Sequence, residues 1–507
     1  MISLIHVLEW RAAVTPDAVA ISDHTGGELT YAGLAAATDR RAAEFAAARI
    51  GTGDVVPIIA RNQAGWVTAM TGLLRAGALP AAVNWRLALP EMTALLRAMQ
   101  PVAIVADEDC GTAAKQAAAG LDYPVPVLMN GADTAGTPGA GIPPPRPADR
   151  LRGPEPAVLV HTSGTTGTPK LVPQTHQQLI AAATVMKLEV PEALPGARYL
   201  CALPLYHPGT IANLACVLLS GGHLHLLRGF EAVRFVDELA ARRIHLTMLV
   251  PTLIQAVTAE VSARAVRPDL SSLAEILYGA SPIWPDVLAQ AVSVLRCRFR
   301  QIYASTETGP LPISTLSPAD HDPARGLLST AGRPSLGWEV RLGERGEIQV
   351  RGAAPVPRYW ADPAATSAAL TTDGFYRTGD VGTFDSRGYL TIIDRLRDVI
   401  ITGGENVFPG EVEAVLADHP AVADIAIIGI PDDRWGETVH AVVVPRTGPY
   451  TGSQFTAELI GYARQRLAGF KCPTGVTLVP SLPRSGTGKL LRASLRAPFW
   501  VGRDRWV

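Results

Sequence analysis

Short apolar runs that alternate with helical patterns constrain the fold of this 507-residue chain more than any other feature of its sequence. Runs at Val19–Ile21, Val55–Ile59 and Val102–Val105 are separated by Ala-rich amphipathic stretches at 31–48 and 66–75. Strands that alternate with helices are typical of βαβ units, which build a mainly parallel sheet. The sequence therefore predicts an α/β fold for its N-terminal part.

Four apolar runs in the middle of the chain each stop at a cluster of small or polar residues. In open α/β sheets, ligands bind outside the carboxyl ends of the strands, so these clusters are candidates for one shared cleft. Most such clusters are ordinary strand-to-helix turns, and periodicity alone does not make them converge. The four predicted strands are Tyr199–Leu203, Thr247–Val250, Glu275–Tyr278 and Arg300–Tyr303.

The pattern changes after Gly332 to short alternating strands at 339–342, 347–350 and 389–393. This change favours a small antiparallel sheet or barrel beside the main body. Beyond Arg395, about 110 residues form a segment long enough to fold alone. Its predicted strands and helices are Val399–Thr402, Ile425–Ile430, His440–Val444, Pro409–Ala417 and Phe455–Leu467.

Charge and cysteine content argue against several classes of protein. The formal net charge is −1, with no sustained basic run, which predicts no binding to nucleic acid or to an anionic membrane surface. The five cysteines show no C-x-x-C spacing, which disfavours a disulfide framework or a zinc site and indicates a reducing compartment. The sequence has no signal-peptide pattern and no uninterrupted stretch of about 18 apolar residues, so the expected location is cytoplasmic, without a membrane span.

A hydroxyl- and glycine-rich loop follows the apolar run Val158–Val160, after a predicted surface linker at 131–154. Residues 162–170 contain five hydroxyl side chains, two glycines and Lys170. Glycines let the backbone approach a ligand closely, and successive N–H groups with hydroxyls form a concave anion site. The spacing does not match a Walker A loop, and a plain Ser/Thr/Gly connector is the alternative. We interpret the loop as a polyphosphate cradle.

Further motifs follow this loop in order. They are Tyr303–Glu307, Tyr376–Asp380, Asp394–Arg395, Gly403–Asn406 and the lysine of the loop 483–489. In this order and spacing, the set resembles the adenylate-forming superfamily of acyl-CoA synthetases, aryl-CoA ligases, peptide-synthetase adenylation domains and beetle luciferases. The resemblance covers nearly the whole chain, from about residue 8 to about residue 492.

The resemblance implies an α/β fold with a specific division. A large N-terminal domain would hold two βα-layered, parallel-rich sheet subdomains and a small β-barrel-like part, and a small α+β C-terminal domain would be mobile. A hinge between them would let the C-terminal domain rotate between two half-reactions, and its pivot would be Arg397. The implied N-terminal domain, hinge and C-terminal domain are residues 1–394, 395–398 and 399–507.

The reaction that the resemblance implies has two steps and uses ATP, Mg²⁺ and coenzyme A. A carboxylate attacks the α-phosphate of ATP to give an acyl-AMP and pyrophosphate, and a thiol then attacks the acyl carbon and releases AMP. Two anions must meet in the first step, so a lysine and a metal ion are needed where repulsion is overcome. Lys489 matches the lysine that bridges the carboxylate and the α-phosphate.

The resemblance also assigns the nucleotide contacts. Glu307 would take Mg²⁺, Thr306 would touch the α-phosphate, and Asp380 would accept from the ribose hydroxyls with help from Arg395. Polyphosphate would be held by Thr162, Ser163, Gly164, Thr165, Thr166, Gly167 and Lys170. The nucleotide-binding turns would be Gly279, Ala280, Ser281, Tyr303, Ala304 and Ser305, with Gly279–Ser281 and Tyr303 bracketing the adenine.

Two further groups of residues match the family's acyl and CoA sites. His207 matches the position that gates the carboxylate end of the acyl pocket, although a lone histidine is more often structural. Gly403 and Gly404 could line a narrow pantetheine tunnel, because larger side chains would block it. The residues at other CoA-contact positions are Arg86, Trp435, Phe470 and Lys471.

The sequence departs from the family pattern at four positions. Leu171 and Ala304 stand where glycine is common, and Arg397 stands where Asp or Lys is usual. Cys472 stands where some aryl-CoA ligases have a basic residue that meets a CoA phosphate. We hypothesise that one half-reaction is impaired, and that adenylation is the more exposed of the two.

The expected substrate is a carboxylic acid without an amino group. An amino-acid substrate needs a carboxylate for its ammonium group, and the stretch Cys201–Ser220 contains no Asp or Glu. Candidate pocket residues are apolar, which favours a bulky apolar or aromatic acid. They are Ile211, Ala212, Tyr278, Ile302 and Leu311.

Three functions remain open from the sequence. The leading one is an acid:CoA ligase, acting as a monomer or homodimer. The second is an enzyme specialised for one half-reaction, either thioesterification of a supplied acyl-AMP or loading of a carrier protein. Relatives of the carrier-loading kind often carry an insertion, and none is found between Trp360 and Asp380. The third is a non-catalytic nucleotide-binding protein, and it is disfavoured by the presence of Lys170, Glu307, Asp380 and Lys489.

Overall fold

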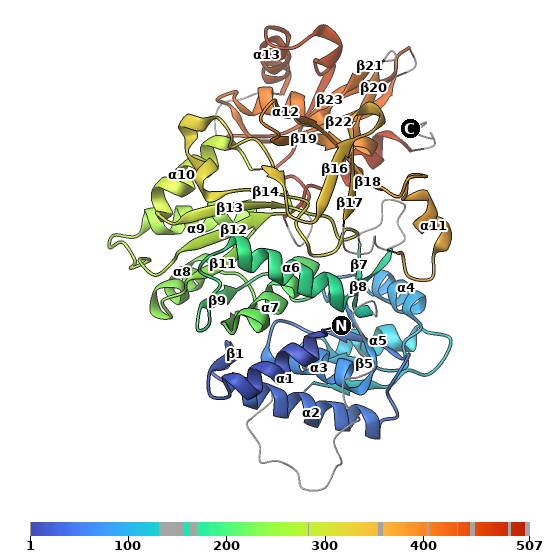
Figure 1. The fold of residues 1–507 in the computed structure, drawn as a ribbon. Helices are drawn as coiled ribbons and strands as arrows, with labels where there is room; N and C mark the ends of the chain where they lie inside the picture. The colour runs from blue at the N-terminus through green and yellow to red at the C-terminus, as the bar shows by residue number, and fades with distance from the viewer. Residues whose placement is uncertain are drawn as a thin grey trace. The chain divides into compact units, whose positions relative to one another are not determined.

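The computed structural model describes residues 2–130, 156–162, 170–281, 283–352, 358–402, 405–432, 434–446, 452–484 and 488–501. These residues form two compact units (Figure 1). Unit 1 comprises Met1–Glu339 and Arg351–Tyr376, and unit 2 comprises Val340–Val350 and Arg377–Val507. The predicted linker at 131–154 lies outside the described residues.

A nine-stranded sheet forms the larger layer of unit 1. Its six central strands run parallel, and the strands at its two ends are antiparallel to their neighbours. In spatial order the strands are β15 (Arg333–Pro334), β14 (Ser314–Leu316), β13 (Arg298–Tyr303), β12 (Glu275–Gly279), β11 (Leu246–Leu249), β9 (Arg198–Cys201), β10 (His223–Leu226), β1 (Val19–Asp23) and β2 (Glu28–Thr30).

A six-stranded sheet forms the second layer of unit 1. Its strands run parallel except for the last pair, which forms an antiparallel hairpin. In spatial order they are β6 (Val127–Met129), β5 (Ile104–Ala106), β3 (Val55–Ile59), β4 (Leu79–Ala82), β7 (Pro156–His161) and β8 (Leu171–Thr175).

Helices cover both faces of each sheet, because parallel strands in βαβ units bury both faces. The central layer packs between the two sheets and consists of α1 (Leu4–Val14), α2 (Tyr31–Ala47), α3 (Ala64–Ala76), α6 (His176–Glu189) and α7 (Pro208–Ser220). The outer face of the nine-stranded sheet packs on α8 (Ala232–Ala241), α9 (Pro251–Ala263) and α10 (Pro285–Leu295). The outer face of the six-stranded sheet packs on α4 (Leu89–Met99) and α5 (Gly111–Ala119).

Local sequence sets the start and end of α7, the helix that follows the predicted gating histidine. His207 is the N-cap residue, and Pro208 occupies the first helical position, where a missing N–H has no consequence. Gly221 ends the helix with φ of 76°, a left-handed conformation that glycine adopts without strain. The cap therefore fixes His207 at the start of a buried helix.

Unit 2 contains two further sheets and three α-helices, among the residues described. The first sheet has the order β16 (Trp338–Leu342), β17 (Glu347–Gly352), β18 (Tyr376–Phe384), β19 (Leu390–Arg395), with some strand ends assigned to unit 1. The second has the order β21 (Glu405–Val407), β20 (Ile400–Thr402), β23 (Gly436–Pro445), β22 (Val422–Asp432), and β24 (Gly475–Leu478) also pairs with β23. The helices are α12 (Pro409–Ala417), α13 (Gly452–Arg464) and α14 (Arg492–Arg496).

Connecting segments complete the description. Helix α11 (Pro363–Ala368) lies in unit 1, together with the 3₁₀ turns η2 (Pro318–His321) and η3 (Pro323–Arg325). Unit 2 holds η4 (Glu344–Gly346), η5 (Leu396–Asp398), η6 (Gly469–Lys471) and η7 (Ala497–Phe499). In the described part of the chain, no helix has both the length and the apolar character needed to cross a bilayer.

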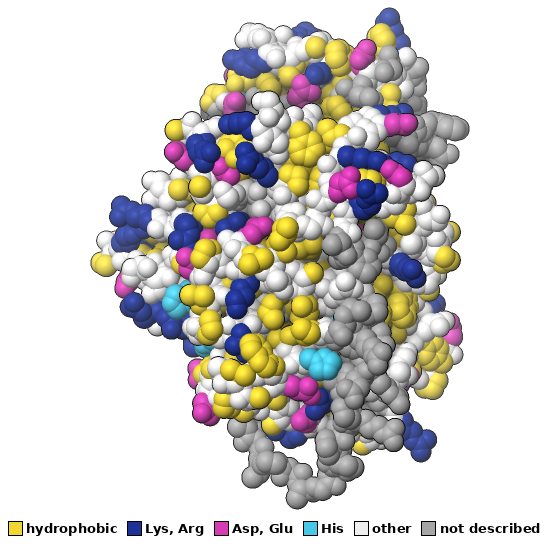
Figure 2. Space-filling view, in the orientation of Figure 1, with side chains coloured by type: hydrophobic (Ala, Val, Ile, Leu, Met, Phe, Trp, Pro, Cys, Tyr) yellow, Lys and Arg dark blue, Asp and Glu magenta, His cyan; other side chains and the backbone are white. Residues whose placement is uncertain are grey.

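The predicted α/β fold with parallel-rich sheets and a separate C-terminal part is confirmed. Helix α12 has the predicted bounds, whereas β5 begins two residues later than the predicted strand and α13 begins three residues earlier. Figure 2 shows basic, acidic and apolar side chains interspersed over the face drawn, in keeping with a formal net charge of −1.

Candidate functional site

The carboxyl ends of β12 and β13 lie side by side in unit 1, because these parallel strands are neighbours with Gly279 opposite Ile302. A β-carbon on Gly279 would lie 2.2 Å from the carbonyl oxygen of Ile302, so no side chain fits there. Ala280 has φ of 72°, a left-handed conformation that strains a residue with a β-carbon. Such strain concentrates at functional sites.

The loop after β13 is held in place by its own hydroxyl groups and by β8. The N–H of Thr308 donates to Ser305 Oγ at 3.1 Å, and the side-chain amide of Gln174 donates to the carbonyl oxygen of Thr306 at 2.8 Å. Ser305, Thr306 and Glu307 are half-buried, and Ala304 is exposed. The structure thus brings Gly279–Ser281 and Tyr303–Glu307 together at the carboxyl ends of two neighbouring strands of the nine-stranded sheet.

Tyr359 joins two residues that the sequence singled out separately. Its hydroxyl donates to Glu307 Oε1 at 3.3 Å, and the Lys170 Nζ lies 4.5 Å from the centre of its ring. Burial and the nearby Glu307 raise the pKa of Tyr359 to about 12. The sequence analysis did not identify Tyr359 as a site residue. The local signal for it was weak and consisted of two adjacent aromatic residues, Tyr359 and Trp360, ahead of the short helix α11.

The predicted polyphosphate loop leaves the ends of the hairpin formed by β7 and β8. The N–H of Thr162 donates to the carbonyl oxygen of Lys170 at 2.9 Å, so the two ends of the loop meet. The interior positions Ser163, Gly164, Thr165, Thr166 and Gly167 lie outside the described residues. The side chain of Leu171 is 5% exposed and belongs to the apolar core beneath α4 and α5, which gives that departure from the family pattern a packing role.

A second histidine lies beside the predicted gating histidine. His161 Nε2 accepts from the N–H of Asn84 at 3.1 Å, and burial, aided by His207, lowers the pKa of His161 to about 4. His207 Nδ1 accepts from the N–H of Gly209 at 3.4 Å. Hydrogen bonds from backbone N–H groups thus fix the orientation of both imidazole rings. His161 was not identified as a site residue from the sequence, although it directly precedes Thr162.

Asp380 and Arg395, the predicted ribose contacts, lie opposite each other on β18 and β19 of unit 2. The Arg395 Nε lies 3.3 Å from Asp380 Oδ1. The Asp380 carboxylate is nearly buried and is therefore oriented by its partner rather than by solvent. Arg397, the predicted pivot, lies in η5 two residues further on.

Arg492 anchors the segment that carries Lys489. Its Nη2 donates to Glu413 Oε2 at 2.5 Å, and its Nη1 lies 3.9 Å from Asp394 and 4.0 Å from Asp398. Burial raises the pKa of Asp394 to about 6, against the opposing influence of Arg492. Burial acts to lower the pKa of Arg492, but Glu413 and Asp394 raise it above its ordinary value. We call these four residues the Arg492 cluster.

The residues predicted to contact CoA are distributed over both units. In unit 1 the Arg86 guanidinium lies 4.9 Å from the centre of a Trp85 ring. In unit 2 Trp435 and Phe470 are exposed aromatic residues, and Lys471 Nζ pairs with Glu411 at 2.6 Å. Gly403 and Gly404 lie outside the described residues.

Cys472 does not present its thiol to solvent. Its Sγ donates to the carbonyl oxygen of Ala468 at 3.4 Å, and the residue is 5% exposed. Burial raises the pKa of the thiol. The side chain is therefore part of the core of unit 2 rather than of a phosphate contact.

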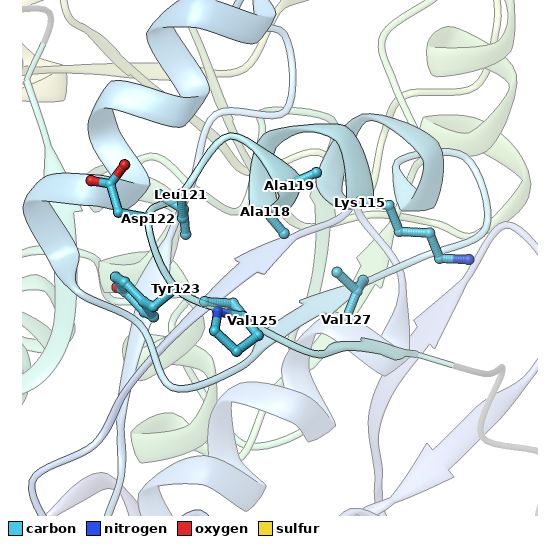
Figure 3. Close-up of a pocket in the computed structure, with 9 residues that line it drawn as sticks. Lys115, Ala118, Ala119, Leu121, Asp122, Tyr123, Val125 and Val127 are labelled. Atoms are coloured by element: carbon cyan, nitrogen blue, oxygen red, sulfur yellow. The ribbon is translucent and has the colours of Figure 1, made fainter.

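The predicted acyl-pocket residues differ in burial. Tyr278 is 1% exposed and its hydroxyl pairs with His321 Nε2 at 3.0 Å, so it is a core residue. Ile211 and Leu311 are also buried, whereas Ala212 and Ile302 are half-buried. A pocket of about 550 Å³ lies elsewhere in unit 1, beside α5 and β6, and is lined by none of the predicted site residues (Figure 3).

The side chains present suit a magnesium nucleotide. Mg²⁺ is commonly held by one or two carboxylates together with substrate phosphates, and Glu307 supplies one carboxylate. In unit 1, Gly279 leaves space that a β-carbon would fill. In unit 2, taken by itself, the Asp380 carboxylate presents acceptor oxygens beside Arg395. Lys170 adds a cation at the end of the predicted polyphosphate loop.

Comparison with known proteins places these features in a family. A sequence model described as AMP-binding enzyme matches residues 8–360, and one described as AMP-binding enzyme C-terminal domain matches residues 411–489. The chain is 35% identical to a feruloyl-CoA synthase of Amycolatopsis sp, over 96% of this chain and 97% of that protein. It is 32% identical to the fatty acid–[acyl-carrier-protein] ligase ScoC of Streptomyces coeruleorubidus, over 95% and 94%.

A solved structure is similar over the same extent. The O-succinylbenzoate coenzyme A synthetase of Bacillus subtilis, in complex with ATP and magnesium ion, superimposes with a TM-score of 0.82 at 28% identity. The match covers 96% of this chain and 98% of that one.

Proposed function

This chain belongs to the AMP-binding enzyme family, and on that basis we propose that it activates a bulky apolar or aromatic carboxylic acid without an amino group and transfers it to CoA. It is an ATP-dependent acid:CoA ligase, and its cofactors are ATP, Mg²⁺ and CoA. The substrate class, the roles of individual residues and transfer to a carrier protein are proposals.

The choice of a non-amino acid is carried by one observation. No carboxylate occurs from Cys201 to Ser220, the stretch that contains β9's last residue, His207 and all of α7. An ammonium group buried without a partner would be strongly unfavourable. Helix α7 instead presents Ile211 and its apolar neighbours to the core.

The residues of this chain act by positioning and by neutralising charge, which is the main contribution of a protein to such transfers. Lys170 and the loop that it ends bind the β- and γ-phosphates. Asp380 accepts from the ribose hydroxyls while Arg395 orients its carboxylate. Lys489 neutralises the approaching carboxylate and the α-phosphate. No nucleophilic side chain is required.

His207 orients the substrate carboxylate from the start of α7. Its N-cap geometry fixes the ring, and the neighbouring His161, neutral at pH 7, adds no competing charge. A bound Mg²⁺ supplies charge neutralisation at the phosphates, and Glu307 is the residue that holds it.

Rotation of the C-terminal domain is proposed to exchange the two half-reactions. In this account residues 1–394 bind nucleotide and acid, 395–398 form the hinge with Arg397 as pivot, and 399–507 carry Lys489. After adenylation Lys489 withdraws, and Gly403 and Gly404 line the path of the pantetheine arm. Such hinges place the dihedral change in a few residues.

A carrier protein is a second candidate acceptor beside CoA. In unit 2, exposed Trp435 and Phe470 with Lys471 offer stacking surfaces and a cation that suit a nucleotide-bearing thiol, and in unit 1 Arg86 offers a cation of its own. The similarity to an acyl-carrier-protein ligase supports the second candidate, in which the same acyl-AMP is passed to a protein-bound pantetheine.

Mass spectrometry of products tests the proposal directly. The purified chain is incubated with ATP, Mg²⁺ and a panel of aryl, fatty, polycyclic and α-amino acids, with CoA or an acyl carrier protein as acceptor. Acyl-AMP and acyl-CoA from an apolar or aromatic acid are expected. Activation of an α-amino acid would contradict the substrate class, and exclusive transfer to the carrier protein would replace CoA as the acceptor.

A further inference from the structure

Tyr359 contacts both Lys170 and Glu307, two residues that the proposed function places on the magnesium nucleotide. The three residues come from separate segments, at the start of β8, after β13 and before α11. We propose that Tyr359 is a positioning residue for magnesium–nucleotide binding, with its hydroxyl orienting Glu307 and its ring holding Lys170. This role rests on the proposed function of the chain.

The hydroxyl of Tyr359 acts on the carboxylate of Glu307. A donor at Oε1 restrains the carboxylate plane and leaves its remaining lone pairs for another ligand. The separation of 3.3 Å is longer than the usual O–H···O distance of about 2.7–2.8 Å, so the contact is a weak hydrogen bond that limits rotation of the carboxylate.

The ring of Tyr359 acts on the ammonium group of Lys170. A cation within about 6 Å of an aromatic centre is attracted to the ring face, and the Lys170 Nζ lies at 4.5 Å. The carbonyl oxygen of Lys170 is already fixed by the N–H of Thr162. The ring therefore directs the side chain of a residue whose backbone is held at the end of the loop.

Tyr359 is itself fixed by three contacts within unit 1. Its N–H donates to Thr366 Oγ1 at 2.9 Å, and the N–H of the next residue, Trp360, donates to the carbonyl oxygen of Leu171 at 2.8 Å. The hydroxyl of Tyr376 also hydrogen-bonds to the Tyr359 phenol. Tyr376 is the first residue of β18, the strand that carries Asp380. A residue held this firmly can impose orientation on its partners.

Binding of ATP to the full-length chain, measured by calorimetry without acid or CoA across a magnesium titration, tests the role of the tyrosine. Tyr359→Phe keeps the ring and removes the hydroxyl. The magnesium concentration at which the increase in ATP affinity is half complete should therefore rise about 5- to 20-fold, while the affinity for ATP without metal stays within about 2-fold of wild type. Tyr359→Leu removes the ring as well and should also weaken metal-free binding. Tyr123→Phe, an exposed tyrosine beside the separate pocket of Figure 3, is the matched control.

A double-mutant cycle separates positioning from a general structural effect. In a Glu307→Gln background, Tyr359→Phe should change the magnesium dependence by less than about 2-fold, because the hydroxyl no longer has a carboxylate to orient. Thermal unfolding of each variant checks folding. An unchanged magnesium dependence in Tyr359→Phe, or an undiminished effect in the Glu307→Gln background, would overturn the inference.

The failure of this inference is distinct from the failure of the proposed function. A wild-type chain that binds magnesium and ATP but ligates no acid rejects the proposed function alone. A wild-type chain that forms acyl-CoA while Tyr359→Phe shows wild-type magnesium dependence rejects the role of the tyrosine alone.

Discussion

Lys170 in unit 1 and Lys489 in unit 2 are both proposed to act on the nucleotide, but their segments are held by different interactions. Lys170 is held by an aromatic ring and by the apolar packing of its neighbour Leu171. The segment of Lys489 is held by the Arg492 cluster, in which a mostly buried guanidinium meets three acidic side chains. The first arrangement combines a cation–π contact with apolar packing, and the second is ionic and buried.

The difference determines how each lysine segment responds to change. A cation–π contact contributes about 0.5–2 kcal/mol, depending on its exposure, and tolerates rearrangement. Removing one partner of a buried ion pair costs about 3–5 kcal/mol, because the remaining charge is left without compensation. The Arg492 cluster should therefore be the more sensitive of the two to substitution, pH and salt.

The largest expected effect is that of Arg492→Met. Glu413, Asp394 and Asp398 would lose their shared cation, so unit 2 should be destabilised by about 3–5 kcal/mol in urea unfolding. Because α14 begins at Arg492, three residues after Lys489, ATP–pyrophosphate exchange should also fall. Arg484→Met, which breaks a half-exposed pair with Asp424, should cost at most about 1 kcal/mol. Equal losses in the two variants would remove the distinction.

Leu171→Ala tests the apolar side of the comparison. Truncating a buried leucine should destabilise unit 1 by about 2–5 kcal/mol, through lost burial and the cavity that remains. Unlike the effect of Arg492→Met, this loss should be nearly the same at low and at high salt, since no charge is removed. A strong salt dependence of the Leu171→Ala loss would contradict the apolar assignment.

Acid should act on the two regions with opposite signs, beginning with His161 in unit 1. Its folded-state pKa of about 4 lies below the ordinary 6.5, so the unfolded chain binds the proton first and stability falls as pH decreases from about 6.5 to 4. His161→Gln should reduce this loss by about 1–2 kcal/mol between pH 7 and 5, measured as the difference in unfolding free energy. An unchanged pH slope would show that His161 is not the titrating group.

Asp394 should show the reverse dependence in unit 2. Its folded-state pKa of about 6 lies above the ordinary 3.8, so the folded chain binds the proton first. The stabilising contribution is fully present below pH 3.8 and is lost as pH rises through about 6. Asp394→Asn should abolish this contribution, which unfolding curves from pH 4 to 7 would detect as a changed slope of stability against pH.

The smallest expected effect is that of Ala304→Gly at the exposed end of β13. Restoring the glycine that is common in the family should change stability by less than about 1 kcal/mol. If the β-carbon hinders adenylation, acid-dependent ATP–pyrophosphate exchange should rise a few-fold while thioester formation from supplied acyl-AMP stays constant. Equal rates for wild type and variant in both assays would reject the hypothesis of an impaired adenylation step.

Patterns along the chain were sufficient to predict the main strands and part of the site. The apolar runs that became β9 and β11–β13 are short, mostly buried strands, which leave a clear signal of strand type. The predicted start of β5 at Val102 was wrong, because Val102 is exposed and strand pairing begins at Ile104. The structure places Asp380 opposite Arg395, and the roles that the family resemblance assigned to both stay predictions.

Long-range contacts could not be predicted in the same way. Tyr359 reaches Glu307 across 52 residues, and Arg492 reaches Glu413 across 79. Neither pair has a local spacing or motif, because its geometry depends on how distant segments pack. The inward orientation of Cys472 was equally invisible, since a small thiol fits both a core and a surface.

The two half-reactions of Lys489→Ala provide the most direct test of the account. Acid-dependent ATP–pyrophosphate exchange and CoA thioester formation from supplied acyl-AMP are measured on the same preparation, with wild type as the reference. If Lys489 neutralises the meeting anions only during adenylation, exchange should fall at least about 100-fold while thioester formation stays within about 3-fold. An equal fall in both reactions, or wild-type exchange in Lys489→Ala, would contradict the account.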